Sequence, residues 1–193
     1  SGRYSRAAVK TVDGVRPGVG SGALGADRRF GRFDPAIGIA YSPTRTYNVY
    51  AGYNQGNRTP TAIELGCADP ANPCKLPNAL AGDPPLEQVV AKTAEAGMRG
   101  KLGLHTNWNA SVFRTDNFDD ILFVADNSAG FGYFKNFGKT RHQGFELGLD
   151  SQVGNIGFGM QYTYLDATYR SAEIVNGASN SSSDADSPGL EGN

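Results

Sequence analysis

Residues 156–164 carry the sequence Ile-Gly-Phe-Gly-Met-Gln-Tyr-Thr-Tyr, in which large apolar side chains occupy every second position. Glycine, glutamine and threonine fill the positions between them. A period of two residues is typical of a β-strand with one apolar and one polar face. The turn at residues 153–155 joins this strand to residues 145–149, which alternate in the same way. The two segments are therefore predicted to form an antiparallel hairpin.

The same alternation recurs along most of the chain. Tyr47, Val49 and Tyr53 share one parity, while Asn48 and Asn54 lie on the other. Glycine supplies 26 of the 193 residues, which argues against a helix-dominated protein because glycine disfavours helix interiors. We therefore predict an all-β antiparallel meander. Its seven strands are Arg3–Val12, Arg32–Ser42, Thr46–Gly56, Val90–Gly103, His105–Val124, Phe131–Gln152 and Ile156–Arg170.

The segment Asp83–Ala96 is ambiguous, because prolines after an acidic cap also favour the start of a helix. Alternation continues beyond it, however, through Met98 and Leu102. Gly97 and Gly100 would each cost a helix about 1 kcal/mol. We therefore predict a strand from about Val90 to Gly103.

The composition of the two faces favours a membrane barrel over a soluble sandwich, although a sandwich also alternates. The polar parity carries Gly, Asn, Ser, Gln and Glu, which suit a wet interior. On the other parity, Phe33 and Tyr41 lie eight residues apart, about 26 Å along a strand. A tilt of about 40° reduces this to about 20 Å, close to the height of a lipid-facing band between two aromatic girdles.

The predicted connections alternate between short and long. Those near Pro43, Gly103 and Gly154 are tight, whereas about 13–31, 57–89 and 169–193 are long and polar. Outer-membrane barrels show this pattern, with short periplasmic turns and long extracellular loops. Such barrels close with even strand numbers, because an open sheet in lipid leaves backbone groups unpaired. We therefore expect residues 1–193 to be a single-domain fragment of a larger barrel.

Charge and hydropathy argue against a nucleic-acid-binding protein and against a helical membrane protein. Lys and Arg number 18 and Asp and Glu 19, so no polycation is available for a nucleic-acid partner. The longest apolar run, Ile121–Ala125, is far shorter than the roughly 18 residues of a membrane helix.

Two cysteines, Cys67 and Cys74, flank a segment with two prolines and an aspartate. These residues favour a turn that could bring the two sulfur atoms within bonding distance. We expect a disulfide, which implies an oxidising compartment; the alternative is a pair of free thiols.

Catalytic chemistry is not indicated. Asp116, Asp119 and Asp120 have no neighbouring histidine in the sequence, and a polar barrel rim is the simpler interpretation. His142 shares the lumenal parity with Glu146 and is expected to hydrogen-bond across strands. We assign no catalytic residue, no metal ligand and no cofactor.

Several segments resemble TonB-dependent outer-membrane receptors in the order of that family. Residues 53–65 resemble its strand-to-loop segment with an Arg-x-Pro-Thr rim, and residues 95–100 its returning Glu-x-Gly strand. Three further segments are similar to its next strands, namely 113–121, 136–138 together with 143–147, and 162–167. The resemblance implies a plugged 22-stranded barrel in the Gram-negative outer membrane. It also implies energy supplied by the TonB complex through the plug domain, which we expect to lie outside this segment.

The resemblance implies a receptor that binds and imports a scarce ligand, such as a ferric siderophore, without making or breaking a bond. Outer-membrane lipid is the other expected partner. Two alternatives stay open: a passive porin, and a secreted β-sandwich that binds carbohydrate. The candidate ligand contacts are Tyr53, Asn54, Arg58 and Lys75, because cations suit anionic chelates and tyrosine offers stacking area. For each of them, rim solvation or anchoring in the aromatic girdle is the alternative role.

Overall fold

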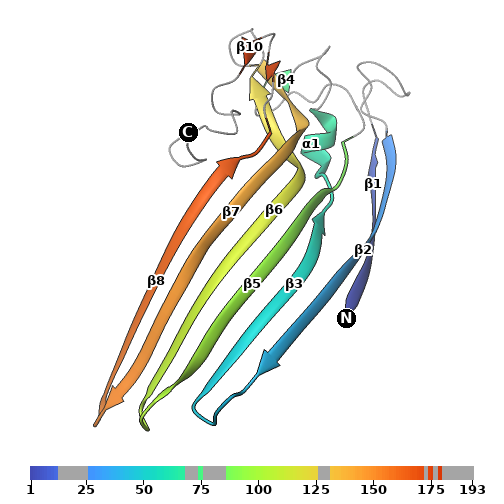
Figure 1. Cartoon of the computed structure of the whole chain (residues 1–193). Coiled ribbons are helices and arrows are strands. Elements are labelled where there is room, and N and C mark those ends of the chain that lie inside the picture. Colours follow the sequence, from blue (N-terminus) through green and yellow to red (C-terminus); the bar gives the residue numbers. More distant parts are fainter. Residues whose placement is uncertain are drawn as a thin grey trace.

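The computed structural model describes residues 1–12, 26–67, 74–75, 86–125, 131–171, 174–175 and 178–179. Long strands run side by side in one tall sheet, with the shorter elements gathered at one end (Figure 1). The long strands are β1 (Gly2–Thr11), β2 (Ala26–Tyr41), β3 (Tyr47–Arg58), β5 (Val89–Leu102), β6 (Thr106–Ala125), β7 (Phe131–Val153) and β8 (Ile156–Tyr169). The short elements are α1 (Ala62–Gly66), β4 (Cys74–Lys75), β9 (Ile174–Val175) and β10 (Ala178–Ser179).

The sheet is an antiparallel meander, as the sequence predicts. Its order is β1-β2-β3-β5-β6-β7, with β8 on the far side of β7 and β4 paired with the loop end of β7. The sheet is not closed: within the described residues, β1 and β8 do not pair with each other. This confirms the prediction of a partial barrel. No helix in the described part of the chain is long and apolar enough to cross a membrane.

The short connections between neighbouring strands lie at one end of the sheet. Gly103 and Gly154 have φ angles of 63° and 62°, the left-handed conformation that two tight turns require and that glycine adopts without strain. The β2–β3 turn is also short and lies at this same end (Figure 1). α1 and β4 lie at the opposite end of the sheet (Figure 1). The predicted short turns at this end are therefore confirmed. Most residues of the predicted long loops 13–31, 57–89 and 169–193 lie outside the described part of the chain, so the long loops stay a prediction.

The structure corrects two details of the predicted loops. β2 already begins at Ala26, inside the predicted loop 13–31, because its pairing with β1 continues to the register pair Thr11 and Ala26. The predicted loop 57–89 contains α1 and β4. The ambiguous segment is a strand, as predicted, and β5 starts at Val89.

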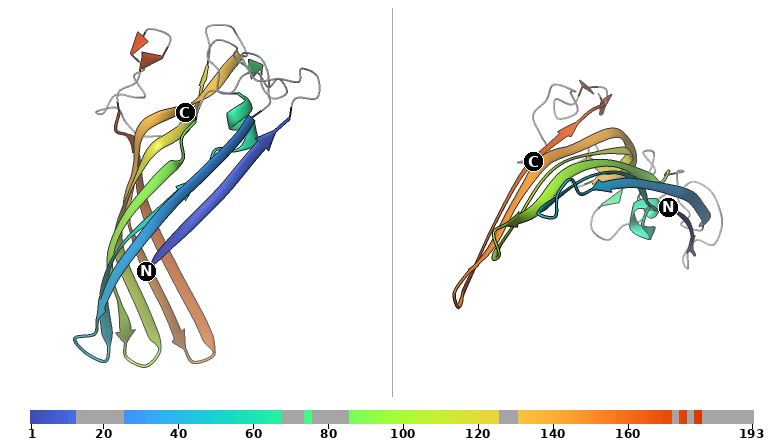
Figure 2. Two further views of the ribbon diagram at one scale, coloured as in Figure 1. Left: turned by 90° about the vertical axis from the view of Figure 1, so that its right-hand side faces the viewer. Right: turned by 60° about the horizontal axis from the view of Figure 1, so that its bottom comes forward.

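The two faces of the sheet differ in how far other parts of the protein cover them. Figure 2 shows that the sheet is curved, with α1 against its concave side. A small core lies there, in which Leu65 of α1 packs with Leu86, Val89 and Ile121. The opposite, convex face leaves large apolar side chains uncovered, and Met160 is 57% exposed. Other exposed members of this face are Phe33, Ile37, Ile39, Tyr41, Met98, Val112, Phe145, Leu147, Phe158, Tyr162 and Tyr164.

These exposed apolar side chains do not fit a β-sandwich, in which a second sheet would cover them. Within the described residues, the only other sheet is the two-stranded pair of β9 and β10, so no second sheet covers the apolar face. A surface of this size is stable only against an apolar medium. The convex face is therefore the lipid-facing surface.

Candidate functional site

The concave face ends, on the loop side, at the short helix α1. Arg58, the last residue of β3, makes two hydrogen bonds from Nη1 to the Glu64 carboxylate, at 3.0 and 2.8 Å. Glu64 also accepts a hydrogen bond from the backbone N–H of Thr61, whose Oγ1 accepts one from the Glu64 N–H. This reciprocal arrangement is a capping box, which satisfies two donors at the start of the helix. Arg58 is thereby held at the mouth of the barrel.

Cys67 follows α1 directly and anchors the same region to β7. Its side chain is 1% exposed and disulfide-bonded, and its carbonyl oxygen accepts a 2.6 Å hydrogen bond from the N–H of Phe134. The backbone of Cys74 pairs with Gly132, and that of Lys75 with Phe131, both in β7. For Cys74 and Lys75 the structure describes only the backbone and not the side chains. The pairing of Cys67 with Cys74 stays our prediction.

The environment of Glu64 favours its charged form. Burial by itself raises the pKa of this carboxyl, but hydrogen bonds from Arg58 and Thr61 and the charge of Arg58 outweigh burial. The pKa of Glu64 therefore lies below its ordinary value of 4.5. The carboxylate is ionised at neutral pH and keeps Arg58 in place.

A pH dependence follows from this lowered pKa. Because the folded pKa is below the unfolded one, the stabilisation by Glu64 is complete above about pH 4.5 and is lost as the pH falls through the folded value. We expect the free energy of unfolding of the wild type to exceed that of the Glu64→Gln variant by up to about 1 kcal/mol at neutral pH. Urea unfolding of the receptor that contains this segment, repeated between pH 3 and 7, measures the difference. A difference that grows on acidification would contradict the assignment.

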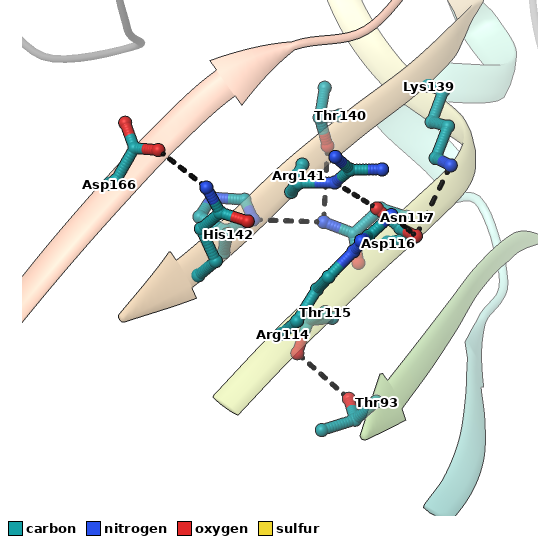
Figure 3. Close-up of polar contacts among 11 residues, drawn as sticks. Thr93, Arg114, Thr115, Asp116, Asn117, Lys139, Thr140, Arg141, His142 and Asp166 are labelled. Carbon is teal, nitrogen blue, oxygen red and sulfur yellow. Dashed lines mark hydrogen bonds and ion pairs between the residues drawn. The ribbon is translucent and has the colours of Figure 1, made fainter. Parts of the chain in front are cut away.

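Polar side chains line a track of separate hydrogen-bonded groups across the concave face of β5, β6 and β7 (Figure 3). Thr93 and Thr115 share a hydrogen bond of 2.9 Å between their hydroxyl oxygens. Asn117 Nδ2 donates to Thr140 Oγ1 at 3.2 Å and lies 3.3 Å from His142 Nδ1. The last contact confirms the predicted cross-strand hydrogen bond of His142.

Thr140 connects this track to the loop end of β6. Its side chain is fully buried and donates to Asp120 Oδ2 at 2.9 Å. Asp119, whose φ is 55°, precedes Asp120 and interrupts the regular strand conformation there. The track therefore ends on an acidic group near the loops.

Closer to the short turns, the concave face carries a second polar group. Tyr50 donates to Glu95 Oε1 at 2.9 Å, and the guanidinium of Arg99 lies 5.8 Å from the centre of the Tyr50 ring. A shallow hollow follows, lined among others by Asn48, Lys101 and Asp150. Between the short turns and the small apolar core at α1, the described concave face is therefore lined mainly by polar side chains.

The structure separates the predicted ligand contacts. Asn54 lies on the concave face, paired in register with Thr93. Arg58 stands four residues further along β3, at the rim. Tyr53 points to the convex face, where its hydroxyl accepts a hydrogen bond from Gln55 at 2.8 Å. This position favours the girdle role for Tyr53.

Sequence reasoning missed Glu64 and the Thr93–Thr115 pair. The capping-box pattern, Thr61 followed three residues later by Glu64, is a signal that could have located α1. The threonine pair has no local signal, because its members are 22 residues apart and meet through strand register.

The chain forms an open antiparallel sheet with a lipid-facing convex side, a mainly polar concave side and a helix at its rim. These features are those expected of part of a large outer-membrane barrel. Residues 1–192 match the family model "TonB dependent receptor-like, beta-barrel". The chain belongs to the TonB-dependent receptor family. Members are outer-membrane barrels of Gram-negative bacteria, which confirms the predicted location. The family consists of receptors and transporters.

Individual relatives are distant. The chain is 28% identical over 134 residues to the "Probable TonB-dependent siderophore receptor PiuA" of Acinetobacter baumannii, covering 67% of this chain and 16% of PiuA. The FrpB iron transporter of Neisseria meningitidis matches 86% of this chain and 23% of its own, with 19% identity and a TM-score of 0.60. The match to the copper transporter OprC covers 86% of this chain and 25% of OprC, with 18% identity and a TM-score of 0.67. The chain thus spans about a quarter or less of these proteins.

Proposed function

We propose that this segment belongs to a receptor that binds a ferric siderophore, or a similar metal chelate, at its extracellular mouth and imports it. Membership of the TonB-dependent receptor family carries the proposal, since the family model covers the chain from residue 1 to 192. The relative PiuA, a probable TonB-dependent siderophore receptor, supports a siderophore as the ligand class. The alternative of a passive porin has no comparable support.

The rim geometry is suited to an anionic ligand. Ferric chelates of the catecholate type are negatively charged, and a guanidinium binds anionic oxygen atoms through two parallel hydrogen bonds. Arg58 is 45% exposed although it is paired with Glu64, so part of its donor set faces solvent. A ligand at the mouth could share this cation with Glu64.

The proposed contacts are Asn54 and Arg58, together with Lys75, which lies in the same loop region. Below them, the hydroxyl and amide groups of the concave face offer successive weak hydrogen bonds. We propose that import consists of binding and passage along this face. The energy would come from the TonB complex through the plug domain.

Arg58→Ala in the receptor that contains this segment is expected to reduce its affinity for a ferric catecholate about tenfold or more. The reason is that a hydrogen bond to a charged group contributes about 1.5 to 3 kcal/mol. The same change combined with Lys75→Ala should lower uptake further. Uptake of a radiolabelled ferric catecholate, and of a ferric hydroxamate, by cells with equal receptor levels measures both effects.

Glu64→Gln separates ligand binding from support of the loop, since both variants break the Arg58–Glu64 ion pair and only Arg58→Ala removes the cation. A ligand contact by Arg58 predicts that Glu64→Gln keeps or improves the affinity. Equal losses in both variants would show that Arg58 acts through the fold of the rim. Lys101→Ala, at the short-turn end of the same face, is the matched control. Wild-type affinity and uptake in both Arg58→Ala and the double variant would refute the proposed contacts.

A further inference from the structure

The convex face does not stay apolar over its full height. Strand register arranges its side chains in transverse rows across β5, β6, β7 and β8. One row is wholly apolar: Ala96, Val112, Phe145 and Tyr164. The next row toward the loops consists of Ala94, Arg114, Gln143 and Asp166. The row after that consists of Lys92, Asp116, Arg141 and Thr168.

The switch from apolar to polar and charged side chains therefore occurs at one level on β6, β7 and β8, and one row later, at Lys92, on β5. Ile156 at the short turn and Tyr164 lie eight residues apart, about 26 Å along the strand and about 20 Å along the membrane normal at a tilt of about 40°. The apolar band of an outer-membrane barrel is about 25 Å tall. The first charged rows thus lie where hydrocarbon gives way to the headgroups of the outer leaflet.

Cations dominate this level. Asp116 is surrounded by Arg141 at 2.7 Å, Arg114 at 3.1 Å and Lys139 at 3.2 Å. Three cations therefore share one carboxylate (Figure 3). Lys92 and Lys139 both lie over the ring of Phe118, at 4.5 and 4.9 Å from its centre. We name Lys92, Arg114, Lys139 and Arg141 the basic belt.

The basic belt has more positive charge than its neighbours neutralise. Arg114, Lys139 and Arg141 pair with Asp116, and the other carboxylate in these two rows is Asp166, which accepts a hydrogen bond from Gln143. The local balance of these six groups is +2. Arg114 is 50% exposed and Lys139 26% exposed, so both can reach a ligand on the outside of the barrel.

We propose that the basic belt binds the phosphate groups of a phosphorylated lipid of the outer leaflet. Its position immediately above the apolar band would set a lipid headgroup against it while the acyl chains lie along Phe145 and Tyr164. Arginine and lysine are the side chains that pair best with phosphate oxygens. Asp116 neutralises part of the charge of three of these cations, so its carboxylate competes with a lipid phosphate for them. The site is separate from the concave face and independent of the imported ligand.

The test compares lipid binding by purified receptor variants that contain this segment. Native mass spectrometry in mild detergent measures the affinity for lipid A with two phosphates and for its monophosphorylated form. The double variant Lys92→Gln, Arg114→Gln should bind the two-phosphate lipid more weakly, by about fivefold for each removed cation. Asp116→Asn, which keeps all four cations, should bind it more tightly than wild type. The one-phosphate lipid should bind wild type more weakly than the two-phosphate lipid.

Arg99→Gln is the matched control, since it removes one cation from the concave face, and it should leave lipid affinity unchanged. Inorganic phosphate at the same phosphate concentration should not displace the lipid. Three results would overturn the proposal: wild-type affinity in the double variant, an equal loss in Arg99→Gln, or displacement by inorganic phosphate. Asp116→Asn guards against a folding artefact, because loss of a purely structural ion cluster would not tighten binding.

Discussion

Met160→Lys is expected to lower the free energy of unfolding of the barrel by about 2 to 4 kcal/mol, the cost of a lysine near the midplane of a lipid-facing strand. Met160 is the central residue of the five large side chains that β8 presents on its convex face, from Ile156 to Tyr164. Its side chain is 57% exposed in the structure, so the protein itself offers no partner for an ammonium group. Urea unfolding of the full receptor in lipid vesicles measures the loss.

Gln161→Lys is the matched control, because Gln161 is the next residue and points to the polar concave face. The same charge is added to the same strand, one residue away. We expect a change in unfolding free energy within about 0.5 kcal/mol. If the two lysine variants were equally stable, the assignment of the convex face to lipid would be wrong, and with it the placement of the basic belt.

Gly144→Ala is the second change with a large expected effect. A Cβ atom at Gly144 would lie 1.9 Å from the carbonyl oxygen of Tyr164 and 3.1 Å from Cζ of Phe113. The carbonyl belongs to the backbone of β8, so it can move only if the paired strands separate. We expect a loss of about 1 to 3 kcal/mol, the usual cost of overpacking. Urea unfolding of the receptor in lipid vesicles measures it.

Two other glycines serve as controls. At Gly148, on the same face of β7, a Cβ would also meet an atom at 1.9 Å, but that atom is the side-chain oxygen of Asn109, which can rotate away. At Gly157 a Cβ would meet nothing within 4 Å. Gly144→Ala should therefore be less stable than Gly148→Ala, and Gly157→Ala should be close to wild type. The reverse order would contradict the close approach of β7 and β8.

The predicted strands and faces agree with the structure because both depend on local properties. Side chains alternate across a pleated strand whatever its neighbours are, so Ile156 to Tyr164 reveal their face without any knowledge of β7. The tight turns were also predictable, since Gly103 and Gly154 mark the positions where a left-handed residue is needed. Arg58 could be proposed for the rim because it lies just beyond the predicted strand Thr46–Gly56.

The partners of these residues were not predictable from their spacing. Arg58 pairs with Glu64 because residues 62–66 fold into a short helix, which was missed inside a predicted loop. Asp116 was expected at a polar rim, but the pattern did not show that Arg141, 25 residues away, would lie opposite it. Such pairs depend on register, and register is fixed by turn length and by a whole ladder of backbone hydrogen bonds.

The amino-acid order alone therefore fixed which side chains face lipid and which face the interior, because a two-residue period is a property of the extended backbone. The folded sheet was needed to bring separate strands into rows, to place a helix at the mouth and to gather three cations around Asp116. Contacts of this kind join residues that are distant in the chain. They exist only once neighbouring strands have paired in one register.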